Sequence, residues 1–185
     1  VDRMLDLVKD DLEDGPGFVD KTFLEPAAGD GNFLVAILQR KLSAITRRFP
    51  DDVWTRESLF ALASIYGIEL LEDNHQDAQA AMLAEFVRFH AERGGVDDVA
   101  APMFRAATFL IGTNVVCGNM LTGKNVHGDD IEFSWWHRVA GAPGLVRREP
   151  FTFSAMRFGA IDFGPGLAYA ERPIDEVHLE RVADA

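Results

Sequence analysis

Three short apolar segments, each followed at once by a turn of polar and glycine residues, most constrain what this chain can fold into. They occupy residues 22–24, 65–68 and 115–117. Between them, apolar residues recur every three or four positions, over 33–45 and again over 78–87, which is the spacing of amphipathic helices. The order strand, helix, strand, helix, strand predicts a parallel sheet with helices packed on its faces.

We predict an α/β fold in which a doubly wound, Rossmann-like sheet carries helices on both faces, either complete or truncated. Residues 131–136 are the candidate for a fourth strand. We assign residues 1–137 to one ligand-binding domain. Glycine and proline recur from residue 141 onward, so residues 138–185 are expected to form an irregular carboxyl-terminal extension with a disordered polar tail. Because the first residue is Val1, we expect a fragment or a processed form.

Charge and cysteine content limit the expected partners and compartment. Eighteen Lys and Arg oppose thirty Asp and Glu, giving a formal net charge of −12, whereas nucleic-acid binders neutralise phosphates with basic surfaces. The candidates for a local basic patch are Arg40, Lys41, Arg47, Arg48, Arg147 and Arg148. A single cysteine, Cys117, excludes an intrachain disulfide and favours a reducing cytoplasm. No apolar run reaches the eighteen residues that would predict a membrane span.

Polar and glycine residues follow each predicted strand, at the end where ligands bind in parallel sheets. They are residues 25–31 after the first strand, Glu69 after the second, and Gly118 with Asn119 after the third. Glycines in the first of these turns allow a ligand to approach the backbone closely. A dinucleotide-binding turn would carry a third glycine where Leu34 stands, so NAD binding is disfavoured. The three strand ends together predict a ligand site at one edge of the sheet.

The string Phe-Leu-Glu-Pro-Ala-Ala-Gly-Asp-Gly-Asn-Phe-Leu at residues 23–34 resembles the cofactor motif of class I methyltransferases. It is similar to the motif of the DNA adenine methyltransferases of restriction–modification systems. Residues 65–70 and 115–121 are similar to the second and third strand motifs of that family. The resemblance covers residues 4–121 and implies that residues 1–137 form an S-adenosylmethionine-binding domain. The implied cofactor residues are Glu25, Pro26, Ala27, Gly29, Gly31, Phe33, Glu69, Leu70, Asn119 and Met120.

The resemblance also implies which part of the cofactor each position serves. Glu25 and the two turn glycines would line the methionine side, and Asn119 with Met120 would flank the adenine. An Asp is common in the family where Asn119 stands, although an amide can also bond to adenine. Glu69 would hold the ribose, since a carboxylate accepts two hydrogen bonds from a vicinal diol.

The catalytic motif of the family, Asp/Asn/Ser-Pro-Pro-aromatic after the fourth strand, is missing. The sequence contains no Pro-Pro, and residues 131–136 stand in its expected place. Only Ser134 and Trp135 offer a polar residue followed by an aromatic one, so we assign no catalytic residue. The resemblance therefore implies a cytoplasmic, bacterial or phage-encoded subunit or fragment that is inactive alone. It would bind DNA weakly or through a partner supplying the catalytic and target-recognition parts.

Other functions remain open on the sequence. The chain could be a non-catalytic structural or regulatory partner, or a methyltransferase for a substrate other than DNA. Residues 118–125 nearly match a P-loop, but Asn125 replaces the Ser or Thr that binds Mg²⁺. Five histidines lack the spacing of a metal-binding motif, so the sequence predicts no metal site.

Overall fold

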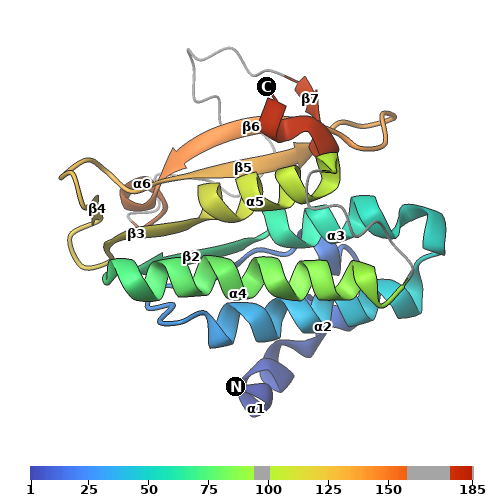
Figure 1. The fold of residues 1–185 in the computed structure, drawn as a ribbon, viewed down its shortest axis with the longest axis horizontal. Coiled ribbons are helices and arrows are strands. Elements are labelled where there is room, and N and C mark those ends of the chain that lie inside the picture. The colour runs from blue at the N-terminus through green and yellow to red at the C-terminus, as the bar shows by residue number, and fades with distance from the viewer. Residues whose placement is uncertain (94–100, 158–175, 185) are drawn as a thin grey trace.

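The computed structural model describes residues 1–93, 101–157 and 176–184, and Figure 1 shows the arrangement of its elements. In chain order these are α1 (Asp2–Leu5), η1 (Asp6–Val8), η2 (Asp10–Asp14), η3 (Phe18–Asp20), β1 (Phe23–Glu25), α2 (Asn32–Arg48), η4 (Asp51–Val53), α3 (Trp54–Ala63), β2 (Ile65–Glu69), α4 (Glu72–Ala91), α5 (Pro102–Asn114), β3 (Val115–Asn119), β4 (Lys124–Asn125), β5 (Glu132–Arg138), β6 (Leu145–Thr152), α6 (Phe153–Arg157), β7 (Glu176–His178) and η5 (Leu179–Asp184). The fold is α/β, as the sequence predicts.

The three predicted strands are neighbours in one sheet and run parallel. The strand order is β1-β2-β3-β4, and only the last pairing, between β3 and the two-residue β4, is antiparallel. Phe23 pairs with Ile65, and Gly67 pairs with Val115. The alternation of strand side chains gives the sheet two apolar faces, and β2, at its centre, is buried throughout.

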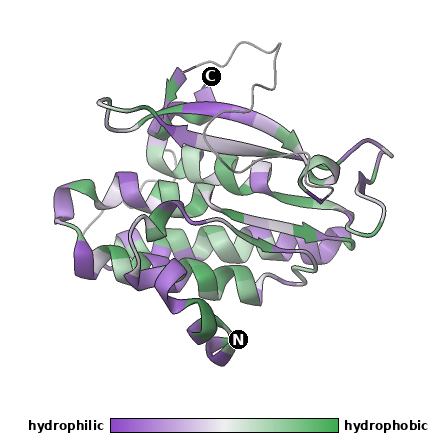
Figure 2. Cartoon of the chain, turned by 180° about the vertical axis from the view of Figure 1, so that it is seen from behind, coloured by the Kyte–Doolittle hydropathy of each residue, from purple (hydrophilic) through white to green (hydrophobic). Residues whose placement is uncertain are grey.

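The long helices all cover one face of this sheet. Figure 1 shows α2, α3, α4 and α5 in front of the strands, and Figure 2 shows the strands uncovered by these helices when seen from behind. In α2 the fully buried Leu34, Leu38 and Leu42 are spaced four residues apart, so one stripe of the helix faces the core. Ile65 and Val115 join the same core from the sheet.

The opposite face corrects the prediction of helices on both sides. Tyr66 and Ile68 of β2 pack there against Phe133 of β5 and Phe153 of α6. The Tyr66 ring lies edge-on to that of Phe133, with centroids 5.4 Å apart. A three-stranded antiparallel sheet, in the order β5-β6-β7, thus replaces a second helix layer. In Figure 2 the long strand β6, which lies between β5 and β7, carries hydrophilic stretches, as expected of a strand with one face toward solvent.

The fourth predicted strand and the predicted extension are corrected by the same sheet. Residues 132–138 form a strand, as expected, but β5 does not join the parallel sheet. It pairs with β6 along its whole length, from Glu132 with Thr152 to Arg138 with Val146. A boundary at residue 137 would therefore cut a hairpin, and the described part of 138–185 is regular rather than irregular.

The end of the chain is also more ordered than the sequence predicts. Residues 158–175, which include the start of the predicted polar tail, lie outside the described residues. Residues 176–184 form β7 and η5, and Leu179 and Val182 of η5 are buried in the main core. Among the described residues, no helix is both long enough and apolar enough to cross a membrane.

Candidate functional site

The carboxyl ends of β1, β2 and β3 meet at one edge of the parallel sheet, and a hydrogen bond joins the first two. The Gly29 N–H donates to Glu69 Oε2 at 2.7 Å, across 40 positions of sequence. The Ala28 N–H donates to the Ile68 carbonyl at 2.9 Å, which fastens the same turn to β2. Two of the predicted strand-end motifs are thus in direct contact.

Glu69 is a buried carboxylate that organises this edge. It is 8 % exposed, and its other oxygen, Oε1, accepts from the Leu71 N–H at 3.0 Å. The hydrogen bond from Leu71 is the main reason why the pKa of the Glu69 carboxyl is lowered, with Gly29 adding to it against the effect of burial. Glu69 is therefore ionised at neutral pH, and its contacts with the Leu70 N–H and the Asn74 side chain also favour the charged form.

Glycine stands at the two positions of the turn for different physical reasons. Gly31 has φ +88°, and a Cβ there would lie 2.8 Å from the Cα of Ala78, so close packing against α4 requires it. Gly29 has φ +57°, but a Cβ there would meet nothing within 4 Å. The space above Gly29 is open, whereas Gly31 is explained by packing alone.

The remaining predicted positions divide between the edge and the cores. Glu25 ends β1, where its Oε1 accepts from the Ala27 N–H at 3.1 Å, and Pro26 is half-buried beside it. Leu70 directly follows β2 and is 60 % exposed. Phe33, in contrast, is partly buried against the main core. Met120 is partly buried against the cluster of Tyr66, Ile68 and Phe133 on the other face of the sheet.

Asn119 ends β3 and shapes the turn that follows. Its Oδ1 accepts from the N–H groups of Leu121, at 2.9 Å, and Thr122, at 3.3 Å. Leu121 is 75 % exposed. The residues that resemble a P-loop run from this turn into β4 and not into a helix, and Lys124 pairs with Asp130 at 3.1 Å. The geometry does not suit a phosphate-binding loop.

Ser134 and Trp135 lie away from this edge. The Ser134 carbonyl accepts from the Tyr66 hydroxyl at 3.1 Å, and its N–H donates to Asn114 Oδ1 at 3.3 Å. Ser134 is fully buried, and its hydroxyl accepts from Arg148 Nε at 2.8 Å. Asn114 comes just before β3, so this cluster lies toward the amino ends of the parallel strands.

A cleft of about 260 Å³ lies at that opposite end. It is lined by Trp135, His137 and Arg138 of β5, and by Thr22 and Ser64, which come just before β1 and β2. Trp135 therefore faces a cavity that is separated from the Gly29–Glu69 edge by the length of the strands.

The basic side chains of the predicted patch around Arg40 form ion pairs and hydrogen bonds within the chain. Arg40 pairs with Glu13 and with Asp6, and Arg47 also pairs with Glu13. Lys41 is fully buried, and its Nζ donates to the carbonyls of Val19 and Lys21 and to the Ser64 hydroxyl. This patch offers little free positive charge to a polyanion.

One group of potential metal ligands was missed by the sequence analysis, which predicts no metal site. The structure brings Glu72, His75 and Cys117 together, with one ligand atom of each within 4.8 Å of the others. The sequence signal was a Glu-x-x-His pair at the start of a helix. The third member, Cys117, lies on the neighbouring strand β3, and its position in the cluster follows from the pairing of Glu69 with Cys117.

Comparison with known proteins gives no match. No protein-family model matches the chain, and neither a curated protein nor a solved structure matches it. The argument for a function therefore depends on the residues at the strand ends and on their geometry.

Proposed function

We propose that this chain binds S-adenosylmethionine at the carboxyl edge of β1–β3, as a subunit or fragment related to DNA adenine methyltransferases. The observation that carries the proposal is the hydrogen bond from Gly29 to Glu69. Two positions that the family resemblance marks, 40 residues apart, lie side by side at the edge where parallel sheets bind ligands.

The chemistry of the edge suits the ribose and the cationic parts of this cofactor. Glu69 is ionised, and a carboxylate can accept hydrogen bonds from the two hydroxyls of a vicinal diol. Glu25 adds a second carboxylate at the end of β1, and Asp30 a third in the exposed turn. S-adenosylmethionine carries a sulfonium and an ammonium group, which carboxylates attract. The space above Gly29 would receive the methionine portion.

Apolar side chains at the same edge suit the adenine ring. Leu70 follows β2 and Leu121 follows β3, and both are large apolar residues exposed to solvent. Single exposed leucines are common on protein surfaces, but a ligand covering these two would remove apolar area from water. An aromatic base between the ends of β2 and β3 would cover apolar surface, while the Asn119 amide nitrogen could bond to a ring nitrogen.

A catalytic role has less support than cofactor binding. Ser134 is enclosed by Tyr66, Asn114 and Arg148 and does not reach the proposed cofactor. The second candidate function is therefore a non-catalytic partner that binds the cofactor for structural or regulatory reasons. A methyltransferase for a substrate other than DNA is the third, and substrate tests with the full chain distinguish these possibilities.

Isothermal titration with S-adenosylmethionine tests the proposal, first through Glu69→Gln. This change keeps a hydrogen-bond acceptor for one of the two backbone N–H groups and removes the charge that would hold the ribose. We expect binding to weaken by roughly 1.5–3 kcal/mol, which is about 10- to 150-fold. Asp51→Asn, an exposed carboxylate beyond the far end of α2, should leave the affinity unchanged. No measurable binding by the unmodified chain would overturn the proposal.

A second pair of variants tests the open space above Gly29. Asn tolerates a left-handed backbone better than other side chains, so Gly29→Asn adds bulk with little strain. We expect it to abolish cofactor binding. Gly17→Asn is the matched control, because Gly17 also has positive φ and open surroundings but lies before β1. Equal binding by both variants would mean that the cofactor does not occupy this space.

A further inference from the structure

His75 carries a buried nitrogen that has no hydrogen-bond partner. Its Nδ1 is enclosed and unpaired, whereas its Nε2 lies 2.9 Å from the Val115 carbonyl and 2.9 Å from Gln79 Nε2. Glu72 Oε1 lies 4.0 Å from Nδ1. A buried nitrogen without a partner is costly unless something binds it.

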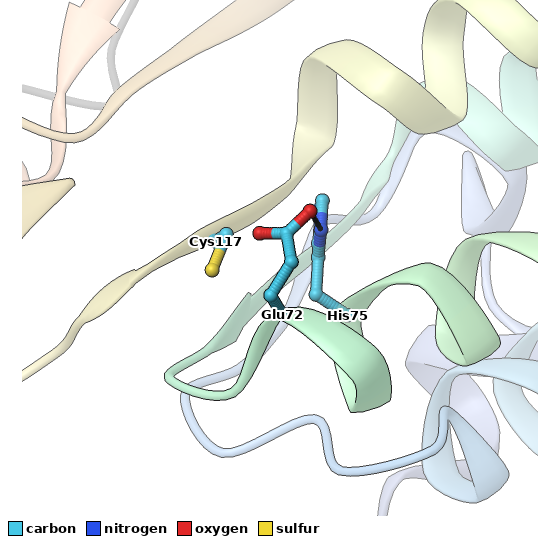
Figure 3. Close-up of side chains that lie close together, drawn as sticks. All are labelled: Glu72, His75 and Cys117. Carbon is cyan, nitrogen blue, oxygen red and sulfur yellow. Dashed lines mark ion pairs between the residues drawn. The ribbon is translucent and has the colours of Figure 1, made fainter. Parts of the chain in front are cut away.

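The other two members of the cluster complete a set of three different donor atoms. Glu72 opens α4, His75 lies one turn later on the same helix face, and Cys117 lies on the neighbouring strand β3. Figure 3 shows the Glu72 carboxylate between the Cys117 thiol and the His75 ring. Glu69, paired with Cys117 across the two strands, adds negative charge that favours a cation.

We propose that Glu72, His75 and Cys117 bind a divalent transition-metal ion of the Zn²⁺ type. Each contributes one atom: a carboxylate oxygen, imidazole Nδ1 and Sγ. With Nδ1 bound to the ion, Nε2 carries the proton and donates to the Val115 carbonyl, an outer-shell contact of the kind that orients metal-binding histidines. Gln79 then donates to that carbonyl and not to the ring. The thiol loses its proton to solvent as the sulfur–metal bond forms.

The donor set selects the class of ion. Thiolate and imidazole favour Zn²⁺, Co²⁺ and Cu ions over Mg²⁺ and Ca²⁺, which prefer oxygen ligands. Bond lengths of about 2.0–2.3 Å to such ions place tetrahedral ligand atoms roughly 3.3–3.7 Å apart, so a set within 4.8 Å needs to close by only about 1 Å. The Glu72 side chain is 60 % exposed, and its Oε1 accepts from Gln76 Nε2 at 2.9 Å. The fourth position would be open to water or another ligand.

Titration of the reduced, chelator-treated full chain with Co²⁺ tests the proposal. Because Cys117 is the single cysteine of the chain, any thiolate-to-cobalt charge-transfer band in the near ultraviolet must come from it. We expect this band to saturate at one ion per chain and to be displaced by Zn²⁺ but not by Mg²⁺. Cys117→Ser should abolish the band. His75→Ala and Glu72→Gln should weaken Co²⁺ binding at least tenfold, while the exposed His127→Ala should not.

Three results would overturn the proposal. They are the absence of the band, an unchanged Co²⁺ affinity in His75→Ala, or saturation at one ion per two chains, which would indicate bridging between two cysteines. Circular dichroism of each variant shows whether it is folded. Glu69→Gln should retain metal binding, so a failure of the cofactor proposal and a failure of the metal proposal give different results.

Discussion

At the scale of single residues, burial has changed the chemistry of His90. The ring is 7 % exposed and packs among Phe86, Phe89 and Phe104. Its Nε2 lies 3.0 Å from the Ser58 hydroxyl. Burial lowers the pKa of His90 to about 4, so the imidazole is neutral at neutral pH and serves the core rather than a site.

His90 should make the fold sensitive to acid. The pKa in the folded chain is below the ordinary value of 6.5, so the unfolded chain binds the proton more tightly. The contribution of His90 to the free energy of unfolding is therefore fully present above pH 6.5 and is lost as the pH falls toward 4. Between pH 7 and pH 4.5 we expect His90 to account for a loss of about 2–3 kcal/mol. Urea unfolding of His90→Gln should show a correspondingly smaller loss, while the exposed His127→Gln should behave like the unmodified chain.

At the scale of elements, Arg138 ties the second sheet to the helix layer. From the end of β5 its guanidinium donates to both oxygens of Glu57 on α3 and, at 2.8 and 2.9 Å, to Asp20 in η3. It also lies 3.5 Å from the ring centroid of Phe60. Glu57 is 3 % exposed, and Arg138 and Arg56 together lower the pKa of its carboxyl against the effect of burial.

Removing Arg138 should leave a buried carboxylate with only Arg56 to balance it. We expect Arg138→Met to destabilise the chain by about 3–5 kcal/mol, the range for breaking one side of a buried ion pair. Adding Glu57→Gln to that variant should restore part of the loss, because the unpaired charge disappears. Arg147→Met, exposed on β6, is the control for urea unfolding. A loss below 1 kcal/mol for Arg138→Met would contradict the proposed link.

At the scale of the whole molecule, charge and topology both oppose activity on DNA by this chain alone. The net charge is −12. Arg40 and Arg47, which belong to the predicted basic patch, form ion pairs with Glu13 and Asp6. The antiparallel sheet occupies the face where the sequence predicts a second helix layer, and it keeps Ser134 away from the proposed cofactor. Binding and catalysis are therefore expected to be separable.

We expect purified chain to transfer no labelled methyl group from S-adenosylmethionine to adenine in mixed-sequence DNA at low salt. The reason is that the sequence lacks the Pro-Pro-aromatic motif that would orient a target amino group, and positioned groups of this kind are commonly worth about 2.7–4 kcal/mol each. A no-protein sample is the control. Sequence-dependent labelling of adenine above that control would show that the chain is a complete enzyme.

The sequence by itself determined the parallel sheet and its carboxyl edge. Local spacing predicts each strand and the helix after it, and the rule that parallel strands end at one edge brings residues 25–31 to Glu69 without further information. What only the tertiary structure decided are the contacts between segments far apart in the chain. The Glu72, His75 and Cys117 cluster needs the register of β2 against β3.

The antiparallel sheet of β5, β6 and β7 could not be predicted from the sequence for a related reason. The sequence predicts a strand at residues 131–136, but strand pairing depends on which edges and faces remain unoccupied once the first sheet has formed. The β5–β6 hairpin therefore pairs with itself and packs its apolar side on Tyr66 and Ile68. The burial of Lys41 is likewise a tertiary result, because only the fold brings the carbonyls of Val19 and Lys21 to its ammonium group. Local sequence patterns reflect interactions over a few residues. The contacts described here close long loops, and the entropy cost of closing them is offset only when the whole core is assembled.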